Sequence, residues 1–313
     1  MIEVVDLQKR YGDTEAVRGI SFEVRRGEVF GLLGPNGAGK TSTVEVLEGF
    51  RSRDGGTVRV LGLDPGSRRD LPALRARVGI VLQQTSHYRY LSVRETLWMH
   101  QAYYADPRPI DEVLELVGMG DAAGREYREL SGGQQRRLDV GVALIGRPEL
   151  VFLDEPTTGF DPAARRQFWD TIGGLRDLGT TVVLTTHYME EAQALADRVA
   201  VMHGGHIVGT GTAADLARNL ELASTLSFRL PEGMSVSDLP EDACHDSHVR
   251  DGVVTMQCPH PTQAMATLCS WAIERGIELR DLELRAPSLE DSYLTLTSSD
   301  KPADETQQSV VGS

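Results

Sequence analysis

Gly34-Pro35-Asn36-Gly37-Ala38-Gly39-Lys40-Thr41-Ser42 is the stretch that decides the fold, because it fits the pattern G-x-x-x-x-G-K-[ST]. An apolar strand pattern at residues 28–33 precedes it, and a helix pattern begins at Lys40. Without this context the same residues would also be compatible with a flexible turn. Strand, glycine loop and helix together predict a phosphate-binding loop in an α/β fold.

The residue types of this loop suit a nucleoside triphosphate and Mg²⁺. Glycines allow backbone N–H groups to wrap phosphate oxygens where a Cβ would obstruct them, and the helix N-terminus adds partial positive charge. We expect all nine residues quoted above to surround the phosphates, with Lys40 reaching the β and γ groups. Thr41 is expected to ligate Mg²⁺ through its hydroxyl, and Ser42 supports it by hydrogen bonding.

Two carboxylates, Asp154 and Glu155, follow a second apolar strand pattern at residues 150–153. Both should therefore emerge at the carboxyl edge of a parallel sheet, where ligands bind. Asp154 is expected to hold Mg²⁺ through water, and Glu155 to orient or deprotonate the water that attacks the phosphate. In isolation, a solvated acidic pair at a strand end is an equal alternative; the phosphate loop favours the catalytic interpretation.

Leu130-Ser131-Gly132-Gly133-Gln134 reproduces the LSGGQ signature, and here the chain resembles the ABC ATPase family. Ser131 and Gly133 at a helix N-terminus make a second anion site, suited to a γ phosphate. In the family this site, Ser131 to Gln134, belongs to the opposite protomer. The resemblance therefore implies a head-to-tail homodimer that holds two ATP molecules, each between one phosphate loop and one signature.

Other positions match family motifs one by one. Tyr11 resembles the aromatic that stacks on adenine, with Val17 packing nearby; a strand aromatic in the core is the alternative for Tyr11. Gln83 resembles the glutamine that contacts Mg²⁺ and senses the membrane partner. Asp161 resembles the aspartate that links the two sites across the dimer, and His187 resembles the switch histidine that meets the γ phosphate.

Local patterns divide the chain into regions. Strand patterns cover residues 3–7, 17–24 and 56–60; a helical middle covers 93–145, with Ser92 as N-cap and Glu95 completing a capping box. Strand patterns at 150–153 and 181–185 flank a helix and predict a parallel βαβ unit, and 199–208 predicts a hairpin.

The resemblance implies an ATP-binding domain at 1–220, made of a mixed sheet core, an antiparallel β subdomain and a helical subdomain. Strand patterns at 225–230, 253–257 and 277–284 and a helix pattern at 262–275 predict a small α/β domain at 221–298, with a regulatory or dimer-stabilising role. A disordered tail is predicted at 299–313.

Composition excludes several classes. The 313 residues carry a net charge of −14, which argues against nucleic-acid binding. No apolar run approaches the ~18 residues that predict a membrane-spanning helix, and the start has no signal-peptide pattern, so a cytosolic protein is expected. Cys244, Cys258 and Cys269 lack metal-ligand spacing and are interpreted as reduced structural thiols.

Residues 286–294, with Tyr293 where the family has Phe, resemble the ending of daunorubicin/doxorubicin-resistance type drug-export ATPases. That resemblance implies a separate polytopic permease, attachment at the cytoplasmic face of the cell membrane, and drug or antibiotic efflux. Residues 83–96 would then meet the permease, with His87-Tyr88-Arg89-Tyr90 setting partner choice; an ordinary solvated loop is the alternative. Export of lipid, polysaccharide or another cargo, and a soluble ABC ATPase acting on ribosomes, are further alternatives.

Overall fold

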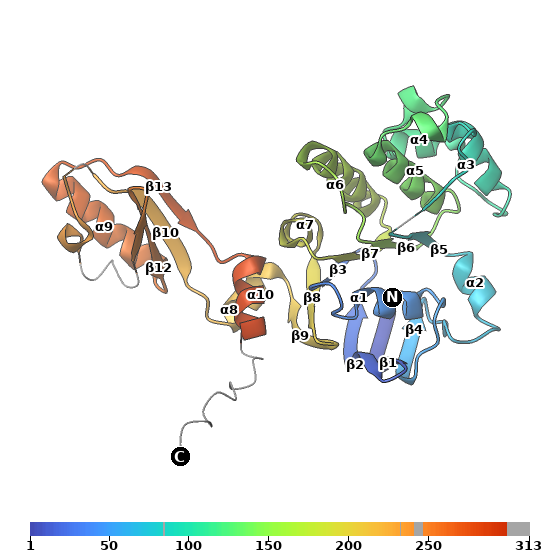
Figure 1. Ribbon diagram of the computed structural model, residues 1–313, viewed down its shortest axis with the longest axis horizontal. Helices are drawn as coiled ribbons and strands as arrows, with labels where there is room; N and C mark the ends of the chain where they lie inside the picture. The colour runs from blue at the N-terminus through green and yellow to red at the C-terminus, as the bar shows by residue number, and fades with distance from the viewer. Residues whose placement is uncertain (84, 232, 241–246, 299–313) are drawn as a thin grey trace, which may run out of the picture. The chain divides into compact units, whose positions relative to one another are not determined.

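The computed structural model describes residues 1–83, 85–231, 233–240 and 247–298 (Figure 1). The chain divides into two compact units, Met1–Thr212 and Ala213–Ser313. This division falls earlier than the expected boundary at 220, because helix α8 (Ala213–Asn219) packs against α10 (Leu289–Ser298) in the second unit. The predicted tail at 299–313 and Cys244 lie outside the described residues.

A six-stranded sheet in the order β5-β6-β7-β3-β8-β9 forms the centre of the first unit. The predicted βαβ unit and hairpin are confirmed: β5, β6, β7, β3 and β8 run parallel, and β9 closes the edge antiparallel to β8. The strand bounds are β3 Val29–Leu33, β5 Val78–Val81, β6 Leu150–Asp154, β7 Thr181–Thr186, β8 Arg198–His203 and β9 His206–Gly211.

An antiparallel sheet in the order β2-β1-β4 is the second layer, formed by β1 (Ile2–Tyr11), β2 (Thr14–Val24) and β4 (Gly55–Val60). Helix α1 (Lys40–Leu47) lies between the layers, since it contacts β2 and β4 on one side and β6 and β7 on the other. Short helices α2 (Leu71–Arg75) and α7 (Met189–Leu195) follow β4 and β7.

Strand alternation explains the two hydrophobic cores. Leu150 and Phe152 pack into the core shared with α1 and the antiparallel sheet. Val151 and Leu153 point the other way, into a core built with four helices. These helices are α3 Val93–Gln101, α4 Ile110–Leu116, α5 Gly132–Leu144 and α6 Pro162–Asp177. Because both faces of the parallel strands are covered, the residues of β3, β6 and β7 are all buried.

Helices α3, α4 and α5 pack together as the predicted helical region (Figure 1). The expected capping box is present at the start of α3: the Ser92 hydroxyl accepts from the Glu95 backbone N–H, and the Glu95 carboxylate accepts from the Ser92 N–H. Among the described residues, no helix is both long and apolar enough to span a bilayer.

The second unit has its own antiparallel sheet, in the order β11-β12-β10-β13, covered by helix α9 (Pro261–Arg275). Its strands are β10 Ser224–Arg229, β11 His248–Arg250, β12 Val253–Cys258 and β13 Arg280–Arg285. Leu226, Phe228 and Leu268 are fully buried between sheet and helix. The segment 286–294 enters α10, where Ser288 and Asp291 cap each other at the helix start.

Candidate functional site

The glycine-rich loop lies between β3 and α1. At two of its positions the backbone leaves no room for any residue other than glycine. Gly39 has a φ of +100°, and a Cβ there would lie 2.4 Å from the Ala16 carbonyl oxygen. A Cβ on Gly34 would lie 2.3 Å from the Met202 carbonyl oxygen. The loop is therefore pressed against β2 and β8, and it leads directly into the N-terminus of α1, where backbone N–H groups favour an anion.

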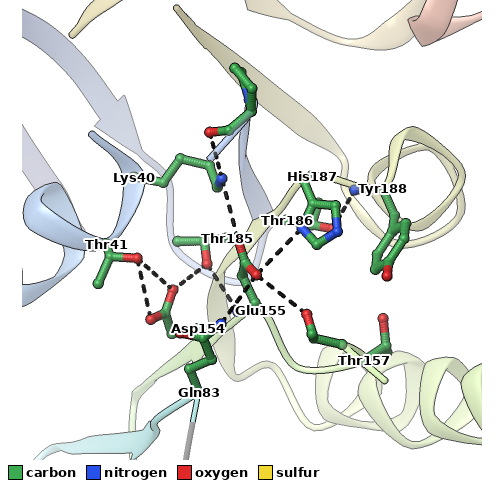
Figure 2. A network of polar contacts seen from close by, with 12 residues as sticks. Lys40, Thr41, Gln83, Asp154, Glu155, Thr157, Thr185, Thr186, His187 and Tyr188 are labelled. Atoms are coloured by element: carbon green, nitrogen blue, oxygen red, sulfur yellow. Dashed lines mark hydrogen bonds and ion pairs between the residues drawn. The ribbon is translucent and has the colours of Figure 1, made fainter. Parts of the chain in front are cut away.

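Lys40, the first residue of α1, is turned back into the loop and is only 4% exposed. Its Nζ donates to the carbonyl oxygens of Gly34 at 2.8 Å and Pro35 at 3.1 Å, and it lies 3.3 Å from Glu155 Oε1 (Figure 2). A buried ammonium needs such partners. The Lys40–Glu155 pair joins the glycine-rich loop to the acidic pair after β6, and the sequence predicted phosphate chemistry from each of them.

Asp154, the last residue of β6, lies beside Thr41 and Thr185 (Figure 2). Its two carboxylate oxygens are 3.4 and 3.5 Å from the Thr41 hydroxyl, and Oδ1 accepts from the Thr185 hydroxyl. Burial raises the pKa of Asp154, and the Thr185 hydrogen bond opposes that rise. A divalent cation between Asp154 and Thr41 would offset the cost of burying this charge, so these oxygen donors fit Mg²⁺.

Glu155 is the point on which the remaining polar groups converge. Its Oε2 is 3.4 Å from Gln83 Nε2, 3.3 Å from the Thr158 hydroxyl and 3.4 Å from His187 Nδ1. Its backbone N–H is held by Thr185, at 3.0 Å from the hydroxyl and 3.2 Å from the carbonyl oxygen. This carboxylate is thus held in place at the sheet edge with an oxygen able to accept a proton.

Topology explains the convergence. Gln83 follows β5, Glu155 follows β6 and His187 follows β7, so three neighbouring parallel strands deliver these side chains to one edge of the sheet. The phosphate loop follows β3, the next strand in the same sheet. Ligands bind at this edge of open parallel sheets.

A cavity of about 780 Å³ opens over this edge. Seven of its lining residues were not anticipated from the sequence: Thr14, Glu15, Ala16, Arg18, Thr158, Gly204 and Gly205. The glycines lie in the β8–β9 turn, which the sequence indicated only as a hairpin. The expected residues that line it are Tyr11, Asn36, Gly37, Gly39, Lys40, Thr41, Ser42, Gln83, Glu155 and His187.

Tyr11 and Val17 have different environments. Tyr11 lines the cavity mouth with 40% of its surface exposed, and its hydroxyl is 3.4 Å from Glu45 Oε2. Lys9 Nζ lies 5.3 Å from the centre of the Tyr11 ring. Val17 is 1% exposed and belongs to the core between the two sheets. Tyr11 therefore presents an accessible ring at the cavity, whereas the Val17 side chain packs inside the core.

The signature residues lie elsewhere. Ser131 is the N-cap of α5 and forms a capping box with Gln134, whose backbone N–H is 3.3 Å from the serine hydroxyl. Ser131 and Gly132 are exposed. Asp161 caps α6, accepting from the Ala163 and Ala164 N–H groups at 2.9 Å each. Residues 131–134 and Asp161 are not among the described residues that line the cavity.

Comparison with known proteins places these features in context. The model of the family described as ABC transporter matches residues 17–158, and that of an ABC transporter domain-containing protein-like C-terminal domain matches residues 224–288. The daunorubicin/doxorubicin resistance ATP-binding protein of Streptomyces peucetius is 38% identical over 97% of this chain and 94% of its own length.

Other relatives carry different names. The Nod factor export ATP-binding protein I of Rhizobium meliloti is 36% identical over 95% of this chain and 88% of its own length. Among solved structures, the dimeric structure of a bacterial ABC transporter cassette superposes with a TM-score of 0.61, 22% identity, and coverage of 68% of this chain and 98% of that one. At that identity the likeness concerns the fold.

Proposed function

The chain belongs to the ABC transporter family of ATP-binding proteins, whose ATP hydrolysis is coupled to transport, and from this we propose that it is the motor of an exporter. Two copies bind two ATP molecules between them and drive a separate polytopic permease at the cytoplasmic face of the membrane. The observation that carries the proposal is the convergence of Lys40, Gln83 and His187 on Glu155 at one sheet edge, next to Asp154 at the end of β6.

In the proposed reaction, the γ phosphate lies at the N-terminus of α1. Lys40 exchanges its carbonyl partners for β and γ phosphate oxygens, which also separates it from Glu155. Mg²⁺, when bound between Thr41, Asp154 and Gln83, would supply positive charge to the same oxygens. Loss of the Lys40 contact would leave Glu155 free to accept a proton.

Glu155 then accepts a proton from a water molecule as the water oxygen attacks the γ phosphorus. The bond between that phosphorus and the β–γ bridging oxygen breaks, and ADP carries away the electron pair. His187 meets the transferred phosphate. Its buried Nδ1 lies 3.4 Å from Glu155 Oε2 but makes no hydrogen bond with any described residue. A buried polar atom without a hydrogen bond supports a role that a ligand completes.

A second copy is proposed to close each site with its signature. Residues 131–134 present the N-terminus of α5 and two glycines that leave it open, which suits a phosphate. Their absence from the lining of the described cavity supports completion by a partner copy. Asp161 would then lie near the dimer interface as a helix cap that orients the loop after Glu155.

The permease is proposed to dock on the segment 83–96. Tyr88 and Tyr90 expose 68% and 72% of their surfaces, as expected for a docking patch. His87 does not belong to that patch, contrary to the sequence-based expectation. Its side chain is 6% exposed and bonds to Asp139 on α5. The docking patch therefore consists of Tyr88, Arg89 and Tyr90.

The cargo is proposed to be a hydrophobic drug or antibiotic, because the resistance protein of Streptomyces peucetius matches nearly the full chain. The Nod factor export relative supports a second candidate cargo class at similar identity. The motor residues contact nucleotide, so cargo choice rests with the permease.

The first test is to capture the permease. Tagged Glu155→Gln chain is purified from solubilised membranes with Mg-ATP, and co-purifying proteins are identified by mass spectrometry. We expect a polytopic membrane protein at near-equal stoichiometry. Ribosomal proteins without a permease would instead support the soluble alternative.

A further inference from the structure

Arg136, in the first half of α5, is a buried charge that the reaction described above does not use. It is 7% exposed, and its guanidinium donates to three main-chain carbonyl oxygens. These belong to Leu82, Asp154 and Pro156. Leu82 immediately precedes Gln83, and Asp154 and Pro156 stand on either side of Glu155.

The backbone of Glu155 needs such support. Its φ is +43°, in the left-handed region that costs a residue with a Cβ on the order of 1–3 kcal/mol. The following residue is Pro156, and a residue before proline is driven away from helical backbone angles towards extended ones. Strain of this kind persists only where the surroundings impose it. Arg136 bonds at 3.0 Å to the carbonyl oxygens of Asp154 and Pro156 and so fixes the peptide group before Glu155 and the one after Pro156.

Asp139, one turn further along α5, fixes Arg136 in turn. Its Oδ2 lies 3.4 Å from Arg136 Nη1, and its Oδ1 lies 2.9 Å from His87 Nε2. The side chains of Asp139 and His87 are 7% and 6% exposed. The His87 ring also packs edge-on against Tyr127, with ring centres 5.3 Å apart.

Helix α5 therefore holds the Gln83 segment at two places. Arg136 binds the carbonyl of Leu82 before Gln83, and Asp139 binds the side chain of His87 after it. The same guanidinium holds both sides of Glu155. One buried group thus sets the spacing between the two side chains that meet at 3.4 Å in the cavity, Gln83 and Glu155.

We infer that Arg136 is a positioning residue for ATP hydrolysis, and that Asp139 and His87 hold it in place. It aligns Glu155 and Gln83 through the main chain around them and is not among the described residues that line the cavity. His87 is adjacent to the exposed Tyr88. The buried contacts from His87 through Asp139 to Arg136 therefore connect the docking patch to the backbone around Glu155. The inference rests on the proposed function of Glu155 as the proton acceptor.

The test compares Arg136→Met, Arg136→Lys and Arg137→Met in the full chain. Met keeps much of the volume without the donors, and Lys keeps a charge that can satisfy part of the carbonyl set. Arg137 is the matched control, since it lies on the same helix and donates to the Gly118 carbonyl, away from the catalytic loop. Steady-state kcat and the affinity for a non-hydrolysable ATP analogue are measured for each.

We expect Arg136→Met to lower kcat roughly 10- to 100-fold, the range of a lost catalytic alignment, while analogue affinity stays within about 2-fold. Arg136→Lys should recover part of kcat, and Arg137→Met should resemble the parent chain. A parallel loss of kcat and analogue affinity in both Arg136 variants would indicate a general structural role and overturn the inference. Unchanged kcat in Arg136→Met would overturn it as well.

A double variant separates this inference from the proposed role of Glu155. If Arg136 acts through Glu155, adding Arg136→Met to Glu155→Gln should leave the residual single-turnover rate within about 2-fold. Independent, multiplying losses would overturn the inference and leave the role of Glu155 intact. If Glu155→Gln alone hydrolyses ATP at the parent rate, the proposed function of Glu155 fails instead.

Discussion

The phosphate loop at residues 34–42 and the signature at residues 131–134 are both glycine-rich turns at the start of a helix, yet their surroundings differ. In the first, Lys40 is buried and paired with Glu155, and a cavity opens beside it. In the second, Ser131 is exposed and its hydroxyl is occupied by a capping box. Polar partners and a cavity surround the first turn within this chain, whereas the second presents an exposed helix N-terminus. We interpret them as two halves of one site that two copies assemble.

The largest expected effect concerns the half of the site that contains the phosphate loop and Glu155. Glu155→Gln should slow phosphate release at least ~100-fold, because a general base contributes on that scale. It should also retain Mg-ATP and accumulate a dimer, which size-exclusion chromatography with light scattering would detect. Glu149→Gln is the control, since Glu149 precedes β6 at its opposite end and pairs with Arg77. Parent-like turnover of Glu155→Gln would contradict the assigned role.

The pairing of unlike halves can be tested by complementation. Lys40→Ala disables the phosphate loop and Ser131→Arg blocks the signature, so each variant alone should be inactive. A mixed dimer pairs the intact loop of one with the intact signature of the other. Because half of randomly mixed dimers are heterodimers with one working site, we expect roughly a quarter of parent activity. Inactivity of the mixture, with dimers present, would argue against sites shared between copies.

The docking patch does not belong to the cavity lining among the described residues, so its replacement should affect coupling alone. Tyr88→Ala combined with Arg89→Ala should abolish transport while ATPase activity of the isolated chain is preserved, because neither residue is among the described residues that line the cavity. Arg59→Ala, which replaces an exposed arginine on β4 outside the docking segment, is the control. Transport that persists in the double variant would show that the segment is an ordinary solvated loop.

The smallest expected effect is on stability and concerns Glu48, which follows the end of α1 opposite Lys40. Glu48 is 2% exposed, and burial, with Asp154 and Glu45 nearby, raises its pKa to about 8. A carboxyl group whose folded pKa is raised contributes stability below its unfolded pKa and loses it as pH rises through the folded value. The chain should therefore lose stability between about pH 4.5 and 8.

Glu48→Gln should remove this dependence, because glutamine is neutral at every pH in that window. Relative to the parent, the variant should gain up to about 4 kcal/mol at pH 8 and under about 1 kcal/mol at pH 5. Urea unfolding monitored by tryptophan fluorescence at both pH values would measure the difference. Equal stability changes at the two pH values would mean that Glu48 is ionised in the folded chain.

Short local motifs carry much of the information about this protein. The phosphate loop, the acidic pair after β6 and the signature each depend on a short run of residues, so the sequence predicted the fold class, the βαβ unit and the family. Thr185 escaped notice because a threonine near a strand end has no distinctive pattern. Its importance arises from register, since parallel pairing places it beside Asp154.

What the sequence determined by itself was the chemistry: which side chains suit phosphate, metal and proton transfer at given spacings. Only the tertiary structure decided which of them meet. It buried His87 against Asp139 and away from the docking patch, and it turned Arg136 towards the carbonyls around Glu155. The physical reason is that such contacts join residues far apart in sequence, and their geometry depends on how helix α5 packs on the sheet, which no local pattern encodes.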